Sequence, residues 1–138
     1  MEQRVFELRL SSTLEGPENE PTELQVEVLH DGEWEPLDLN VKTRGFLIFV
    51  YSAFICQHMY LRVNAAERGL LLDSVDGQYK MVASDDWFIQ EIHAHFQATL
   101  RSGQANDDDV EFIVERMKLC PVSRNLKENI TDTRLTFV

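Results

Sequence analysis

Polar and hydrophobic residues alternate along the first third of the chain, most clearly in residues 5–10 and 24–29. Alternation is the pattern of a half-buried β-strand. Asp31-Gly32 predicts a tight hairpin turn, so we expect a third strand at about Trp34 to Asn40. The segment 11–23 is rich in Gly, Pro and Glu and predicts an exposed loop. Together these features predict a small antiparallel meander.

The pattern changes from about Thr43 to Arg68, where hydrophobic residues are nearly continuous at first and then recur on one side only. Gly69 is typical of the residue that follows a helix. We therefore predict one long helix of the kind that is buried inside a larger structure. The β-branched and aromatic content of residues 46–55 leaves a strand open as the alternative there. The longest apolar run has 11 residues, fewer than the ~20 that cross a bilayer, so we expect no membrane span.

Residues 71–82 predict a strand with a turn near Asp76-Gly77. Residues 87–100 fit either a helix face or strict alternation, and the alternation fits better, so we favour a long strand.

Three aspartates at 107–109 predict the start of a helix, whose hydrophobic residues follow at helical spacing through 110–119. Pro121 ends or kinks that helix and can begin another through residues 122–129. Residues 130–138 alternate again and predict a final strand. The whole order predicts an α+β fold with a C-terminal helix pair.

Length and charge narrow the possible functions. The 138 residues are the size of one domain, so we treat 1–138 as a single unit. The net charge is -11, and the first 40 residues hold 11 acidic and 2 basic side chains. Such a surface repels nucleic-acid phosphate and anionic lipid, so we expect neither nucleic acid nor membrane as a partner. No secretory leader is visible at the start, and we expect a cytoplasmic protein.

The two cysteines are the main candidates for chemistry. Cys120 lies directly before Pro121 and is placed to cap the helix expected through 122–129, where the helix dipole and Arg124 would lower its pKa. Cys56 lies in the middle of the apolar helix, where burial raises the pKa of a thiol and makes it inert. From their neighbours alone, a structural role is the simpler interpretation for both cysteines.

His93 and His95 would share one face of the strand predicted at 87–100, an arrangement that can bind a metal. No third ligand is evident in the sequence, and exposed strand histidines are the simpler interpretation. We therefore expect neither a metal nor a cofactor.

The segments "SAFICQHMYL" and "CPVSRNL", together with the order of strands and helices, resemble the OsmC/Ohr family of organic hydroperoxide reductases. The resemblance implies an α+β domain that interlaces as a homodimer. It also implies that Cys56 attacks an organic hydroperoxide, that Cys120 resolves the sulfenic acid as a disulfide, and that an external dithiol reduces the disulfide. The resemblance also implies a role in the response to oxidative stress.

Two features of the family's peroxidases are missing. They carry a glutamate about ten residues before the first cysteine, where this chain has Phe46, and an arginine in the loop after the first strand, where residues 11–23 hold none. Arg44 and Arg124 are the candidates for a replacement cation. The alternative is a non-catalytic OsmC-like dimer, or a small-ligand-binding protein, that has lost the activating Glu/Arg pair.

Overall fold

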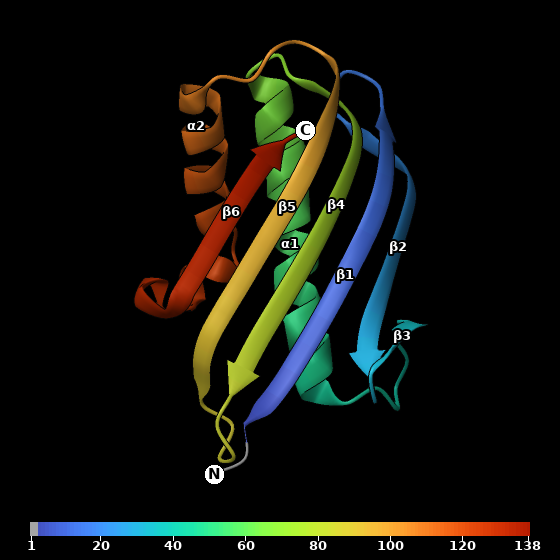
Figure 1. Cartoon of the computed structure of the whole chain (residues 1–138), viewed down its shortest axis with the longest axis vertical. Coiled ribbons are helices and arrows are strands. Elements are labelled where there is room, and N and C mark those ends of the chain that lie inside the picture. Colours follow the sequence, from blue (N-terminus) through green and yellow to red (C-terminus); the bar gives the residue numbers. More distant parts are fainter. Residues whose placement is uncertain (1–2) are drawn as a thin grey trace.

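The computed structural model describes residues 3–138, which form one six-stranded sheet with two α-helices on the same side of it (Figure 1). The strands are β1 (Arg4–Glu15), β2 (Glu20–His30), β3 (Glu33–Pro36), β4 (Leu71–Ala83), β5 (Ile89–Ser102) and β6 (Thr131–Phe137). The helices are α1 (Gly45–Glu67) and α2 (Asp107–Lys118), and two 3-10 turns follow at Ser123–Asn125 and Glu128–Ile130. The predicted α+β class is confirmed.

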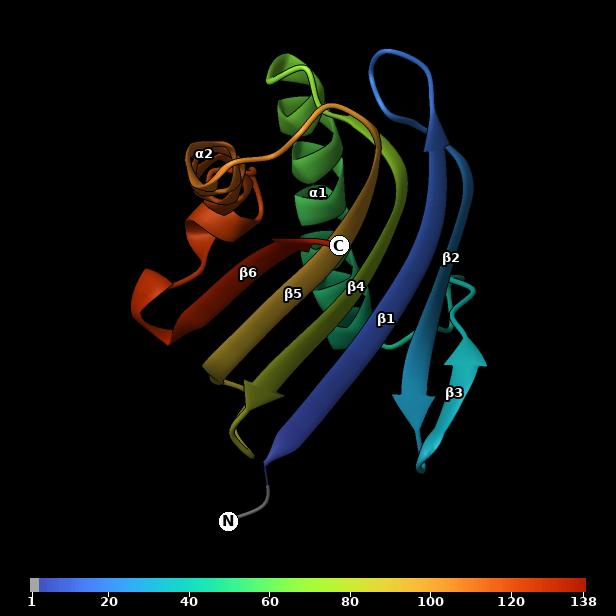
Figure 2. The same cartoon turned by 45° about the horizontal axis from the view of Figure 1, so that its top comes forward.

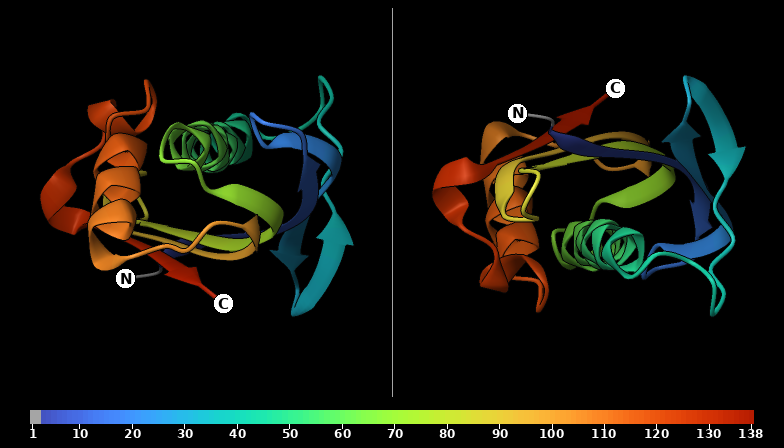
Figure 3. Two further views of the ribbon diagram at one scale, coloured as in Figure 1. Left: turned by 90° about the horizontal axis from the view of Figure 1, so that it is seen from above. Right: turned by 90° about the horizontal axis from the view of Figure 1, so that it is seen from below.

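The strand order across the sheet is β3-β2-β1-β4-β5-β6. Every neighbouring pair is antiparallel except β5 and β6, which are parallel. The strands twist and bend around α1 (Figure 2), and the end-on views show α2 beside α1 on the same face (Figure 3). Within residues 3–138, the opposite face of the sheet therefore carries no helix.

The loop predicted at 11–23 is wrong, because β1 and β2 continue through most of it and leave only a short turn. Thr13 and Thr22 join the two strands through their hydroxyls, 2.6 Å apart, and Leu14 points into the core. Asn19 makes the turn with a φ of 53° and buries its side chain, which donates to the Leu70 carbonyl and accepts from Leu72 N–H. Polar composition misled the prediction, because these groups pair with one another.

The long helix is confirmed as α1, and the strand alternative for residues 46–55 is wrong. Val50, Phe54 and Leu61 on one side of it are fully buried against the sheet. By length and composition α1 could also cross a membrane, a property that the count of consecutive apolar residues did not reveal, but a core helix passes the same test.

The turn predicted at Asp76-Gly77 is wrong, because β4 runs through it without a break. Gly77 is required there by packing. A Cβ at this position would lie 2.8 Å from the Phe96 ring and 3.1 Å from the Phe54 ring. The missing side chain lets α1 approach the centre of the sheet, where Phe54 also stacks on Tyr79 with 5.4 Å between ring centroids.

The first C-terminal helix begins where predicted, and Asn106 and Asp109 close a reciprocal capping box at its start. The second expected helix, through 122–129, is wrong, since only one-turn 3-10 segments form there. Asn125 Nδ2 donates to the Pro121 carbonyl at 2.8 Å and Arg124 Nε to the Leu119 carbonyl at 2.9 Å. These side chains satisfy carbonyls that a continuing helix would have used.

Candidate functional site

The packing of α2 on α1 brings the two cysteines together from positions far apart in the chain. Cys56 lies halfway along α1, and Cys120 follows the C-terminal end of α2. Both are free thiols, and they lie near enough for Cys120 to contribute to the raised pKa of Cys56. The site therefore contains two adjacent sulfur atoms, one half-buried and one fully buried.

Cys120 is held by the turn that follows it. Its thiol donates to the Ser123 hydroxyl at 3.0 Å, and Ser123 N–H donates back to the sulfur at 3.3 Å. The side chain has no solvent exposure. Because only a 3-10 turn follows, the α-helix dipole expected at this cysteine does not exist.

Burial is the main cause that raises the pKa of the Cys56 thiol above the 9.0 of a free cysteine. A backbone hydrogen bond with Val122 acts in the opposite direction, and the hydrogen bond and charge of Cys120 raise the pKa further. Among residues 3–138, none of the groups that shift this pKa is a cation. The raised pKa agrees with the expectation that the apolar surroundings of Cys56 disfavour its thiolate.

Neither of the two arginines considered as replacement cations is among the groups that shift the pKa of Cys56. Arg44 directly precedes α1, 12 residues before Cys56, which is about 18 Å along a helix axis. It lines an open groove of about 990 Å³ together with Phe6 and Leu47. The Arg124 guanidinium is directed to the Leu119 carbonyl through two N–H groups.

Sequence reasoning missed Tyr79 and Gln57. Burial, followed by the charge of Cys120, raises the pKa of Tyr79, so the phenol stays protonated. The Tyr79 hydroxyl and Gln57 Oε1 are both buried without a hydrogen-bond partner among residues 3–138. Buried polar atoms are nearly always paired, so these two retain an unused capacity for a hydrogen bond. The only sequence feature that pointed to a buried Tyr79 was its position on the inward-facing side of the alternating strand β4.

A pocket of about 320 Å³ lies near the turn that holds Cys120, although neither cysteine lines it. It shares Gln57, the neighbour of Cys56, and Ser123, the partner of Cys120. The remaining lining comes from α2 and from the turns that lead to β6: Glu115, Lys118, Leu119, Arg124, Leu126, Glu128 and Thr131. The pocket has room for a small organic molecule close to the segments that carry the two cysteines.

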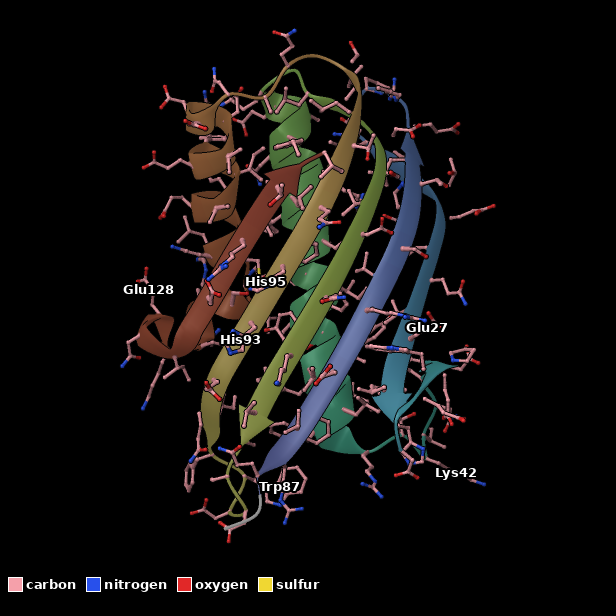
Figure 4. All side chains as sticks on the ribbon, viewed as in Figure 1. Glu27, Lys42, Trp87, His93, His95 and Glu128 are labelled. Atoms are coloured by element: carbon pink, nitrogen blue, oxygen red, sulfur yellow. The ribbon has the colours of Figure 1, made fainter. Side chains whose placement is uncertain are left out.

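The two histidines singled out in the sequence lie on the opposite, helix-free face (Figure 4). Asp132 of β6 lies beside them, and this residue is the third candidate ligand that the sequence did not reveal. A hydrogen bond with His95, followed by contributions from Arg134, lowers the pKa of the Asp132 carboxyl.

Known structures share this architecture. A search of solved structures finds an OsmC-like hydroperoxide resistance protein from Jannaschia sp. CCS1, with a TM-score of 0.60 and 14% identity over 88% of this chain and 86% of that one. An OsmC-like protein from Mycoplasma pneumoniae matches with a TM-score of 0.53 and 14% identity over 83% and 87%. No protein-family model and no curated protein sequence matches the chain. The chain therefore has the OsmC-like fold, with a sequence only 14% identical to either of these two structures.

Proposed function

We propose that the chain is a thiol peroxidase that reduces organic hydroperoxides, with Cys56 as the attacking residue and Cys120 as the resolving one. The observation that carries the proposal is the proximity of Cys56 and Cys120, which lie near enough for Cys120 to raise the pKa of the Cys56 thiol. A disulfide needs Cα atoms within about 7 Å of each other, so the proposal requires α1 and the turn after α2 to bring the two residues that close.

The chemistry would run in three balanced steps. The Cys56 thiolate attacks one oxygen of ROOH, the O–O bond breaks, and protonation of the departing alkoxide gives ROH and a Cys56 sulfenic acid. The Cys120 thiol then attacks the Cys56 sulfur, which releases water and forms the disulfide. An external dithiol transfers two electrons to that disulfide, becomes a disulfide itself, and restores both thiols.

The difference in exposure between the two sulfur atoms predicts which of them the reductant attacks in the last step. Cys120 is completely buried, whereas Cys56 is partly exposed. Thiol–disulfide exchange needs in-line access to the sulfur under attack. The reductant would therefore attack the Cys56 sulfur and release Cys120 first.

The unpartnered Tyr79 hydroxyl can assist the attack where an arginine is missing. It is a protonated donor beside the thiol pair, and a hydrogen bond from it would stabilise the negative charge that leaves with the peroxide oxygen. Tyr79→Phe would remove that donor alone. We expect it to slow the loss of peroxide and to leave the free energy of unfolding unchanged or higher, because it removes an unpaired buried group.

The first test is consumption of cumene hydroperoxide with dihydrolipoamide as reductant. Wild-type protein should remove the peroxide catalytically, Cys56→Ser should show no activity above buffer, and Cys120→Ser should stop after one equivalent in the absence of reductant. The matched control is Ser52→Ala, one turn before Cys56 on α1, where the hydroxyl bonds the Phe49 carbonyl. Full turnover by Cys56→Ser would refute the assignment.

A second function is favoured by the raised pKa of Cys56 and by the absence of any cation among its causes. In that case the chain is a non-catalytic OsmC-like dimer, or a small-ligand-binding protein that uses the pocket beside Gln57. Stoichiometric peroxide distinguishes the two functions. A Cys56–Cys120 disulfide that forms within minutes supports the peroxidase, whereas thiols that stay reduced in folded protein support the binding protein.

Assembly as a homodimer is part of the proposal. Ile48, Met59 and Val63 recur on one side of α1 and are 38%, 45% and 51% exposed. Cys56 lies three residues before Met59, so the two side chains are neighbours on the helix surface. A second copy that covered this apolar stripe would also enclose the thiol. The chain would act in the cytoplasm, where thiols are kept reduced, as one domain over residues 1–138.

A further inference from the structure

The outer face of the sheet contains a group of three side chains that the redox site does not use. Along β5 the even-numbered residues from Ile92 to Ala98 point into the core, so His93 and His95 point outward, away from the helices (Figure 4). The parallel register places Asp132 of β6 directly opposite His93. The two histidines and the carboxylate therefore meet on one surface, although His95 and Asp132 lie 37 positions apart in the sequence.

The three side chains are close enough to share one ion. His95 Nε2 lies 3.1 Å from Asp132 Oδ2, and His93 Nδ1 lies 3.8 Å from the same oxygen. One ligand atom from each residue falls within 4.8 Å of the other two. In a tetrahedral zinc site, where bonds are about 2.1 Å long, neighbouring ligand atoms lie about 3.4 Å apart. Small rotamer changes would close the group around an ion.

The donor types select the kind of ion. Imidazole nitrogens suit zinc and its transition-metal neighbours, whereas magnesium and calcium prefer an all-oxygen set. The side chains are 39%, 44% and 38% exposed, so water can reach the remaining coordination position. Two histidines and one carboxylate with an open position form the donor set of several zinc sites.

The surrounding charges both help and oppose a cation. Glu91 Oε1 lies 3.8 Å from His93 Nε2 and adds negative charge. Arg134 Nε lies 3.1 Å from Asp132 Oδ2, so the guanidinium competes with an ion for this carboxylate. The Arg134 side chain is 69% exposed and can move into solvent. Lys80 of β4 lies opposite His93 and is directed to Glu7 of β1, 3.9 Å away.

We propose that His93, His95 and Asp132 form a binding site for a zinc-class divalent cation, which fastens the edge strand β6 to β5. The site is independent of the proposed peroxidase chemistry, because the thiols lie on the helix side of the sheet. Since β6 pairs with β5 alone in the sheet, an ion held across the two strands would stabilise the C-terminal end of the chain.

The test is a titration of the whole reduced protein with zinc chloride, followed by calorimetry and by the imidazole nitrogen signals of its four histidines. One equivalent should bind, and the signals of His93 and His95 should shift. His58 is 1% exposed and His30 lies on β2, so their signals should not move. Amide hydrogen exchange in β6 should slow when zinc is bound.

Substitutions make the assignment specific. His93→Asn, His95→Asn and Asp132→Asn should each weaken zinc binding by about tenfold or more. Arg134→Gln should strengthen it, because it removes the competing cation. The matched control is His30→Asn, since His30 is also an exposed histidine near two carboxylates, Asp31 at 3.6 Å and Glu35 at 3.7 Å, and its loss should change nothing. The proposal is overturned if zinc does not saturate the protein, if the variants bind as wild type does, or if binding is lost only with Cys56→Ser.

Discussion

At Cys56, the apolar packing that surrounds the helix also opposes the reaction expected of the thiol. Removing a thiolate from water is unfavourable, and only the backbone of Val122 compensates for it. A peroxidase built this way depends on a small fraction of thiolate at neutral pH, or on a cation from a second copy of the chain. The ionisation of this residue is therefore the property that decides between the two proposed functions.

The alkylation rate of Cys56 measures that ionisation directly. Only the thiolate reacts, and the pKa lies above 9.0, so the rate with iodoacetamide should rise about tenfold per pH unit from pH 6 to 9 without a plateau. Peptide mass spectrometry separates Cys56 from Cys120, which is fully buried and should remain unmodified. A plateau near pH 7 would show that an activating cation is present after all.

His58 makes a second prediction at this scale. Burial and then the charge of Arg62 lower its pKa from 6.5 to about 4. Arg62 Nε donates to His58 Nδ1 at 3.3 Å, so the proton of the neutral ring lies on Nε2, which donates to the Ser12 hydroxyl at 2.9 Å. Ser12 in turn donates to the Val75 carbonyl. This network is a structural tie between α1 and the sheet, since the ring is not placed to accept the serine proton.

The unfolded chain takes up a proton at His58 below pH 6.5, whereas the folded chain does so only near pH 4. The contribution of His58 to folding stability is therefore fully present above pH 6.5. It is lost as the pH drops toward 4, which lowers the free energy of unfolding by roughly 3 kcal/mol. Urea unfolding between pH 7 and 5 measures the slope. His58→Gln should flatten it and His30→Gln should not. An unchanged slope in His58→Gln would contradict the assignment.

Sequence reasoning reached some of these residues and not others, for a physical reason. Cys56 and Cys120 were identified through a resemblance that covers their local segments. Tyr79 and Asp132 were not, because their roles come from strand pairing and helix packing with partners many residues away. Periodicity shows which face a side chain occupies, but not which side chain it will meet there.

At the scale of elements, periodicity succeeded where one face is buried and failed where residue type was taken as a turn signal. The strict alternation of β5 and the aspartate-rich start of α2 were predicted correctly. Residues 11–23 and Gly77 were mistaken for a loop and a turn. In both cases a residue type common in turns serves long-range packing, which composition cannot reveal.

Gly77→Ala tests this interpretation of the glycine. The new methyl group would meet Phe96 at 2.8 Å, and relieving that overlap should lower the free energy of unfolding by roughly 1–3 kcal/mol. The matched control is Gly45→Ala at the start of α1, where a Cβ would have no neighbour within 4 Å. That change should raise stability by up to about 1 kcal/mol. Chemical denaturation of both variants measures the difference, and equal effects would contradict the packing argument.

At the scale of the whole molecule, the sheet covers only one side of α1. A helix that is apolar almost all round is usually enclosed on all sides, yet the stripe formed by Ile48, Met59 and Val63 has no partner within residues 3–138. In water this stripe requires a cover, and the proposed second copy supplies one. The same contact would complete the enclosure of Cys56.

Met59→Glu tests both consequences together, since a carboxylate buried in an apolar contact is unfavourable. Sedimentation should give twice the chain mass of 16.0 kDa for wild type and the single mass for the variant. Val41→Glu adds the same charge at a fully exposed position and should remain a dimer. Cys56 should be alkylated faster in Met59→Glu than in Val41→Glu at the same pH, because its cover is lost. A dimer that survives Met59→Glu with Cys56 still protected would place the contact elsewhere. A monomeric wild type would refute the proposed dimer, and the binding site would then consist of the pocket beside Gln57 within a single chain.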